Sequence, residues 1–184
     1  MIAAATDDAI RAAADHLAAG DLVGVPTETV YGLAADATDE TAVRKIFAVK
    51  GRPPTNPLIL HAVDAAAAAE LVDFSNRPWL GESWDVASGF WPGPLTVVVP
   101  RARRVLSVVT AGRETVAVRV PNHPVMTRLL GRCEFPIAAP SANISNYISP
   151  TSARHVDEGL GDRIAMVLDG GPCDVGVEST IIEL

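Results

Sequence analysis

The sequence is poor in cysteine and in aromatic residues. Among 184 residues there are two cysteines, Cys133 and Cys173, and aromatic residues make up 5% of the chain. Two cysteines without a metal-ligand spacing exclude a disulfide-rich scaffold and a zinc site built from cysteine pairs. We expect both to be small, buried thiols, which is the usual state of a free cysteine.

The sequence also lacks a long apolar run and a basic N-terminal region. The first residues, MIAAATDDAIRAAADHL, carry acidic side chains where a secretory signal would need basic ones. No uninterrupted apolar run reaches the roughly 20 residues of a membrane span. We therefore expect a soluble, cytoplasmic protein with no membrane partner.

The sequence has fewer basic than acidic residues, and lysine is much rarer than arginine. The chain has 15 lysine and arginine residues against 22 acidic residues, a net charge of −7, and its only lysines are Lys45 and Lys50. This balance disfavours nonspecific binding of nucleic acid by a broadly basic surface. It leaves open a local basic pocket.

Apolar periodicity predicts helices that alternate with strands. We predict helices over residues 7–19, 39–50, 64–71, 77–91, 123–133 and 152–160, and strands over residues 22–26, 58–62, 95–99, 115–121, 136–140, 164–170 and 179–184. Such interleaving is typical of an α/β fold. Because some neighbouring strands lack a helical crossover, we expect a mixed sheet, built as one domain over residues 1–184.

Polar side chains follow several of these strands. The stretch PTETVYG, residues 26–32, comes directly after a buried strand. Ligands of open α/β sheets bind beyond the carboxyl ends of strands, which is where Thr27, Glu28, Thr29 and Tyr31 fall. The alternative is a turn that carries a helix cap.

The stretch KGRPPTNPLILH, residues 50–61, joins two cations to a stiff segment. Lys50 and Arg52 flank a predicted helix C-terminus, where the helix dipole alone would favour positive charge. The prolines that follow hold the backbone extended, and a rigid segment costs less entropy to keep in a binding geometry. His61 ends the strand on the face opposite Leu60; it is either structural or a ligand contact.

The stretch TVAVRVP, residues 115–121, alternates sharply. Its valines take one face, and Thr115, Ala117 and Arg119 take the other. An arginine in the middle of a strand needs a partner, because a buried unpaired charge is costly. That partner is solvent, an acidic residue, or a ligand carboxylate or phosphate held by the guanidinium fork.

The stretch PIAAPSANIS, residues 136–145, again runs from an apolar strand into small polar residues. Ser141, Asn143 and the later Ser149 are candidate donors to phosphate or ribose oxygens. The GVEST segment near the C-terminus offers Ser179 in a similar position. The alternative is a polar turn before a helix.

Together these stretches predict a concave site with three cations and many hydroxyl donors, which suits a small anionic ligand. The sequence has no Walker A motif, no G-x-G-x-x-G after a strand and no G-x-S-x-G elbow. A bound nucleotide would therefore be held by side chains rather than by a common phosphate loop.

Six segments also occur in a familiar order: PTETVYGL, KGRPPTNPLILH, WPGPLTVVV, VAVRVPNHP, PSANIS with SPT, and GVESTII. In this the chain resembles the YrdC/Sua5 family of threonylcarbamoyl-AMP synthases over nearly its whole length. The resemblance implies a twisted mixed α/β sheet flanked by helices around a basic-lined cavity.

The resemblance also implies two sets of binding residues, carried over by motif. The L-threonine set is Thr29, His61, Arg119, Ala139 and Ser179, and the ATP set is Arg52, Asn56, Thr115, Ser141, Asn143 and Ser149. Lys50 and Arg52 would act in catalysis by stabilising the phosphates.

The activity implied is synthesis of L-threonylcarbamoyladenylate from L-threonine, bicarbonate or CO2, and ATP, with release of pyrophosphate. It is the first step of t6A modification at position 37 of tRNA. Mg²⁺ would arrive with ATP and have no dedicated protein ligands. The implied partners are the other proteins of the t6A pathway, with a weak tRNA contact. The alternatives are a carbamoyl-adenylate-forming domain of a carbamoyltransferase and a module that binds double-stranded RNA or tRNA.

The sequence departs from the family at two points. Asn146 stands where glycine is common, although asparagine tolerates a left-handed backbone. Family members continue past the position of Leu184 with a further arginine, and Sua5-type members add a second domain. We expect residues 1–184 to form a single YrdC-like domain without that second domain.

Overall fold

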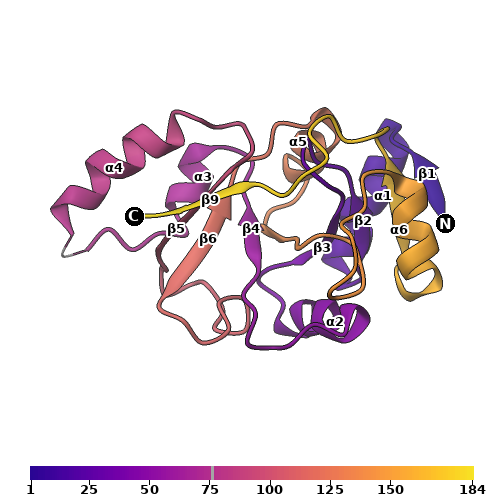
Figure 1. Ribbon diagram of the computed structural model, residues 1–184, viewed down its shortest axis with the longest axis horizontal. Coiled ribbons are helices and arrows are strands. Elements are labelled where there is room, and N and C mark those ends of the chain that lie inside the picture. Colours follow the sequence, from indigo (N-terminus) through magenta and orange to yellow (C-terminus); the bar gives the residue numbers. More distant parts are fainter. Residues whose placement is uncertain (76) are drawn as a thin grey trace.

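A nine-stranded mixed sheet runs through the structure, a computed structural model that describes residues 1–75 and 77–184. The strand order is β1-β8-β2-β3-β7-β4-β6-β5-β9. In Figure 1, β1 and the N-terminus lie at one end of the molecule, and β9, α4 and the C-terminus lie toward the other. The predicted α/β class and mixed sheet are therefore confirmed.

The strands are β1 (Ile2–Ala4), β2 (Val23–Val25), β3 (Gly32–Asp36), β4 (Ile59–His61), β5 (Leu95–Pro100), β6 (Thr115–Arg119), β7 (Ile137–Ala138), β8 (Met166–Asp169) and β9 (Thr180–Glu183). The helices are α1 (Asp7–Ala18), α2 (Glu40–Lys50), α3 (Ala65–Ala69), α4 (Pro78–Ser88), α5 (Pro124–Leu130), α6 (Ala153–Leu160) and the 3-10 turn η1 (Gly161–Arg163). None of the described helices is both long and apolar enough to cross a membrane.

The first two helices each begin at a polar residue that caps them. The Thr6 side chain accepts a hydrogen bond from the Ala9 amide at the start of α1. At the start of α2 the capping residue is Asp39, whose carboxylate accepts from the Thr41 amide at 2.8 Å. Both helices bury their apolar stripe against the sheet, which fixes where α2 ends and where Lys50 lies.

Two strands, β1 and β3, are not indicated by the apolar periodicity of the sequence. The sequences of β1 and β3 are IAA and GLAAD, and alanine and glycine are depleted in strands generally. Pairing supplies what local propensity lacks: β3 lies antiparallel to β2 on one side and to β7 on the other. The PTETVYG stretch forms the loop between β2 and β3 and ends in Gly32, the first residue of β3, so this stretch joins two strands and is not a helix cap.

The middle of the sheet has one covered face and one partly open face. In β6, Val116 and Val118 are buried, whereas Thr115 and Ala117 are half-buried, which confirms the predicted alternation. The neighbouring strand β4 runs parallel to β6, and its His61 pairs with Arg119. Directly paired residues point to the same side of a sheet, so His61 and Arg119 share the partly open face.

Candidate functional site

Arg119 is the centre of a buried polar cluster. Only 4% of the residue is exposed. Its Nη1 donates to the Thr29 hydroxyl at 2.9 Å and its Nε to the Gly93 carbonyl at 3.3 Å. Its Nη2 lies 2.7 Å from Glu28 Oε1, in an ion pair whose angles are not those of a hydrogen bond. Of the partners that the sequence left open for Arg119, the acidic residue is therefore present.

The loop that presents these partners is shaped by Thr27. The Thr27 hydroxyl donates to the Val30 carbonyl at 2.6 Å and accepts from the amides of Thr29 and Val30. A side chain that caps its own loop in this way satisfies backbone groups that are hidden from water. All residues from 26 to 31 are buried, so Glu28 and Thr29 reach Arg119 from a fixed backbone.

His61 lies beside Arg119 as an uncharged ring. Burial, and then the positive charge of Arg119, lower the pKa of His61 to about 3. Its Nδ1 atom is buried and has no hydrogen-bond partner among the described residues. The imidazole is thus neutral at physiological pH, and its Nδ1 is shielded from solvent.

Lys50 is buried and fully engaged. It is 1% exposed, and its Nζ donates to the carbonyls of Ser141 and Asn143 at 2.5 Å each and to Asn143 Oδ1 at 3.2 Å. An ammonium has three donor hydrogens, and three protein oxygens meet them here. Burial and the nearby Arg52 lower its pKa to about 8. The structure therefore brings Lys50, Ser141 and Asn143 together, with Lys50 fastening the loop.

Arg52 and Asn56 face more open surroundings. The Arg52 guanidinium is half-buried and donates to the backbone carbonyls of Asn56 and Pro57, at 3.1 and 2.8 Å. These bonds curl the arginine back along the proline-rich segment. The Asn56 side chain itself is exposed. Burial lowers the pKa of Arg52, which keeps its charge.

A segment near the C-terminus, residues 170–179, crosses the β2–β3 loop and links the two clusters. The amides of Val175 and Gly176 donate to the carbonyls of Glu28 and Thr29, at 2.9 and 3.0 Å. Farther along the same segment, Glu178 comes close enough that its negative charge offsets part of the lowering of the Lys50 and Arg52 pKa values by burial.

Two serines predicted to bind substrates are held by this segment. Ser149 donates to Glu178 Oε1 at 2.6 Å. Ser179 shares a hydrogen bond of 2.7 Å with Thr96. The segment thus places Ser149 beside the charges of the Lys50 cluster and ties Ser179 to β5.

Two predicted residues have less direct connections. Ala139 is buried and its amide donates at 3.1 Å to the carbonyl of Ile59, which begins the strand that His61 ends. Thr115 is half-buried at the start of β6, four positions along the strand from Arg119 on the same face. Within residues 1–75 and 77–184, no hydrogen bond links its side chain to another predicted site residue.

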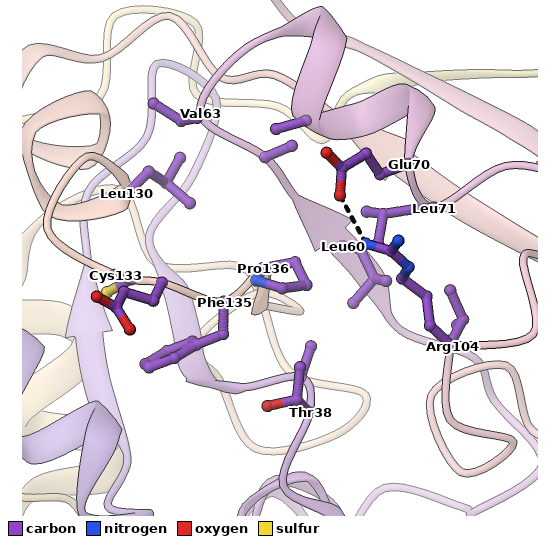
Figure 2. Close-up of a pocket in the computed structure, with 15 residues that line it drawn as sticks. Thr38, Leu60, Val63, Glu70, Leu71, Arg104, Leu130, Cys133, Phe135 and Pro136 are labelled. Carbon is purple, nitrogen blue, oxygen red and sulfur yellow. Dashed lines mark hydrogen bonds and ion pairs between the residues drawn. The ribbon is translucent and has the colours of Figure 1, made fainter.

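A separate pocket of about 320 Å³ was not anticipated from the sequence. Figure 2 shows it between Leu60, Leu130, Phe135 and the ion pair of Glu70 with Arg104. Leu60 points away from the face that carries His61, so β4 separates this pocket from the cluster around Arg119. The pocket contains none of the predicted site residues.

The candidate site thus has two parts. The enclosed half consists of Glu28, Thr29, His61 and Arg119, whose buried charges are balanced within the protein. The open half consists of Arg52, Asn56, Thr115 and Ser149, which are half-buried or exposed. This arrangement suits a small polar ligand in the first part and a larger anion that stays partly solvated in the second.

Fold and sequence together define the class of protein: a mixed-sheet α/β protein without a common phosphate-loop motif, whose candidate site is built from side chains. Residues 15–184 match the family model named Sua5/YciO/YrdC, which is described as telomere recombination. The chain therefore belongs to the Sua5/YciO/YrdC family, and the resemblance drawn from its six motifs is confirmed.

Sequence relatives agree with this assignment. The chain is 50% identical to the threonylcarbamoyl-AMP synthase of Pyrococcus abyssi over 95% of this chain and 50% of that protein. It is 46% identical to the Bacillus subtilis protein of the same name, over 96% of this chain and 50% of that protein. The chain thus spans about half the length of these two relatives.

Solved structures share the fold. The crystal structure of P. abyssi Sua5 complexed with L-threonine superposes with a TM-score of 0.94 at 47% identity, over 100% of this chain and 54% of that one. E. coli YciO superposes with a TM-score of 0.86 at 18% identity, which supports the fold alone.

Proposed function

We propose that this chain forms L-threonylcarbamoyladenylate from L-threonine, bicarbonate or CO2, and ATP, and releases pyrophosphate. Relatives that are 50% and 46% identical are named threonylcarbamoyl-AMP synthase, and a structural neighbour at 47% identity binds L-threonine. In this proposal residues 1–184 act as one catalytic domain, and the product serves the first step of t6A37 modification of tRNA.

The buried guanidinium of Arg119 is the observation that carries the proposal. Each terminal nitrogen of a guanidinium bears two hydrogens, and one protein partner faces each of Nη1 and Nη2. One hydrogen on each nitrogen remains for a ligand. Two such parallel donors match the two oxygens of a carboxylate, which the threonine substrate supplies.

The enclosed half of the site would hold threonine with its amine toward the open half. The amine nitrogen attacks the carbon of CO2 and loses a proton, which gives a carbamate. A carbamate oxygen then attacks the α-phosphorus of ATP, the bond to the β-phosphate oxygen breaks, and pyrophosphate leaves. The protein acts by bringing the reactants together and by balancing the charge that develops on phosphate.

The open half would bind the nucleotide. Arg52 supplies charge to the phosphates, while Asn56, Thr115 and Ser149 supply neutral polar contacts. Lys50 stabilises the phosphates through its nearby positive charge, without direct contact. It also holds the Ser141–Asn143 loop, whose side chains donate hydrogen bonds to the nucleotide. We assign catalytic roles to Lys50 and Arg52 on this basis.

Mg²⁺ belongs to the proposal as a companion of ATP. No cluster of three or more potential metal-ligating side chains occurs among the described residues. The residues present therefore do not fit a dedicated magnesium site, and we assign none. Mg²⁺ prefers to keep several waters and to bind substrate phosphates, so it would enter with the nucleotide.

The product must pass to other proteins, because adenylates are activated donors and not final products. The proposed partners are the proteins of the t6A pathway that transfer the threonylcarbamoyl group, with tRNA itself making a weak contact. The net charge of −7 limits that contact to a local basic surface. The proposed location is the cytoplasm.

The test is pyrophosphate release from ATP by the 184-residue chain in the presence of bicarbonate. The proposal expects release that depends on added L-threonine. Release that depends instead on carbamoyl phosphate would favour a carbamoyl-adenylate-forming activity. Wild-type rates in both Lys50→Ala and Arg52→Ala proteins would remove the catalytic roles assigned to these two residues.

A further inference from the structure

Glu178 places a carboxylate of the protein itself beside the open half of the candidate site. Its Oε1 accepts a hydrogen bond from the Ser149 hydroxyl at 2.6 Å. Its negative charge also lies close enough to Lys50 and Arg52 to offset part of what burial does to their pKa values. Three residues that the proposed function assigns to ATP and its phosphates therefore lie near an internal acidic side chain.

The hydroxyl hydrogen of Ser149 is already used in this contact. A serine hydroxyl carries one hydrogen, so it donates to one acceptor at a time. A nucleotide oxygen that accepts from Ser149 must therefore take the place of Glu178 Oε1. A carboxylate oxygen is an anionic acceptor, as a phosphate oxygen is, so the two compete for the same donor.

The contact has little part in holding the fold together. Glu178 is exposed, and within residues 1–75 and 77–184 it forms no direct ion pair with Lys50 or Arg52. Water can replace either partner of an exposed hydrogen bond, so the loss of this bond leaves no buried polar group unsatisfied. The contact can therefore break without disturbing the surrounding structure.

The backbone on both sides of Glu178 is held in place, so the contact depends on its side chain. Before Glu178, two backbone amides of the same segment are bonded to the β2–β3 loop, and after it the Thr180 amide donates at 3.0 Å to the residue that precedes β5. In Figure 1 this is the yellow segment that leads into β9. Rotation of the Glu178 side chain is enough to release Ser149, and a shorter acidic side chain on the same backbone does not reach it.

We propose that Glu178 is an internal competitor of ATP, which holds the Ser149 hydroxyl until the nucleotide displaces it. The inference rests on the proposed function, because it takes Ser149 to contact ATP. The carboxylate offsets part of the positive charge of Lys50 and Arg52, and the phosphates of ATP take over this role. Glu178 therefore weakens ATP binding by the free energy needed to break its contact.

Other roles for Glu178 predict different results. A carboxylate that orients Ser149 for ATP, or that meets the Mg²⁺ arriving with ATP, strengthens nucleotide binding, so its removal weakens binding. A carboxylate that repels the phosphates only through its charge acts without the Ser149 contact. Substitutions that remove the contact with and without the charge separate these roles from competition.

The first experiment measures the Kd of ATP with Mg²⁺ by calorimetry for the wild-type, Glu178→Ala and Glu178→Asp proteins. Aspartate keeps the charge but is one methylene shorter than the contact requires. We expect both variants to bind ATP about 3- to 10-fold more tightly, the range for one hydrogen bond. Unchanged or weaker binding in Glu178→Ala would overturn the inference, and so would a wild-type Kd in Glu178→Asp, which would leave charge alone as the cause. Both outcomes leave the proposed function standing, whereas a set of folded proteins that do not bind ATP at all contradicts it as well.

The second experiment introduces Glu178→Asp into a Ser149→Ala protein. Ser149→Ala removes the donor for which Glu178 and ATP compete, so the added substitution should change the Kd of ATP by less than about 2-fold. A gain as large as in the presence of Ser149 would place the effect outside this contact and refute the competition.

Glu183→Ala and Glu183→Asp are the matched controls. Glu183 is an exposed glutamate of β9, five positions along the chain, and its side chain has no hydrogen bond in the described part of the chain. Both controls should bind ATP as the wild-type protein does, and the same gain in Glu183→Ala would reveal a general effect of net charge and count against Glu178. Circular dichroism checks that each variant is folded. If Glu178→Ala does not fold, Glu178→Asp still decides the matter.

Discussion

The two halves of the site handle positive charge in opposite ways. In the enclosed half, Arg119 is 4% exposed and faces a protein carboxylate, a hydroxyl and a carbonyl. In the open half, Arg52 is half-buried, and its hydrogen-bond partners among the described residues are backbone carbonyls. A buried cation needs its balancing charge built into the fold, whereas a solvated one leaves its charge for the ligand.

Lys50 is buried like Arg119, but its hydrogen-bond partners are neutral oxygens like those of Arg52. Its position also explains why lysine suits this site better than arginine. Its compact ammonium sits among three oxygens of the Ser141–Asn143 loop. A planar guanidinium presents its donors in a fork and needs more room. In the proposed function, the charge of Lys50 acts on the phosphates through space. Its three hydrogen bonds hold the Ser141–Asn143 loop in place.

The largest expected effect comes from removing the cation of the enclosed half. Arg119→Ala leaves Glu28 as a buried, unpaired carboxylate, which costs about 3–5 kcal/mol of unfolding free energy. Binding of L-threonine should also become undetectable by calorimetry. Arg104→Ala is the control, since both partners of its pair with Glu70 are 63% exposed and the cost should be about 0–1 kcal/mol. Similar costs for the two variants would contradict the contrast between buried and exposed pairs.

A smaller effect is expected at Lys50. Lys50→Ala leaves three oxygens without a donor and should cost about 1–3 kcal/mol, measured by urea unfolding. ATP turnover should fall with it. Lys50→Arg keeps the charge but does not fit the cage, so it should recover little of either property. Full recovery in Lys50→Arg would show that charge alone matters at this position.

The pH dependence of the unfolding free energy should reveal the buried, uncharged state of His61. The pKa of His61 falls from 6.5 in the unfolded chain to about 3 in the folded protein. Below pH 6.5 the unfolded state binds a proton that the folded state does not, so stability is lost as pH falls toward 3. The slope attributable to this group is at most about 1.4 kcal/mol per pH unit. His61→Gln should show a shallower loss in urea unfolding over this pH range, and an unchanged slope would place the ring in a different environment.

The smallest effect on folding is expected in the open half. Arg52→Ala removes a half-buried cation whose partners are backbone carbonyls that water can reach, so the unfolding free energy should change by less than about 1 kcal/mol. The KM for ATP should rise by about 10-fold, while affinity for L-threonine stays near wild type. Equal losses for both substrates would show that the two halves do not act separately.

Much of the fold can be predicted from the sequence because its local cues agree with its tertiary structure. Thr6 and Asp39 cap helices whose apolar stripes are buried, and the valines of β6 alternate as a half-covered strand must. The strands β1 and β3 could not be predicted, since their alanines acquire strand geometry only through pairing with distant segments.

The sequence predicts which residues belong to the candidate site, but it does not predict which atoms they bond to. The motif around Thr29 placed Glu28 in the same loop, yet only the fold shows that Glu28 meets Arg119, which lies on the distant strand β6. The partners of Lys50 are carbonyls more than 90 residues away, with sequence separations of 91 and 93. Backbone acceptors carry no mark in a sequence, so this cage could not be inferred.

The segment of residues 170–179 has a consequence for how the family can vary. Its contacts with the β2–β3 loop are made by the backbone amides of Val175 and Gly176. Evolution is therefore free to replace the exposed side chains of Val175 and Val177, because they carry neither contact. Selection should instead retain Gly171 and Gly176, whose φ angles of 87° and 74° favour glycine. Homologues should keep the backbone conformation of residues 170–179 while the exposed side chains of this segment vary.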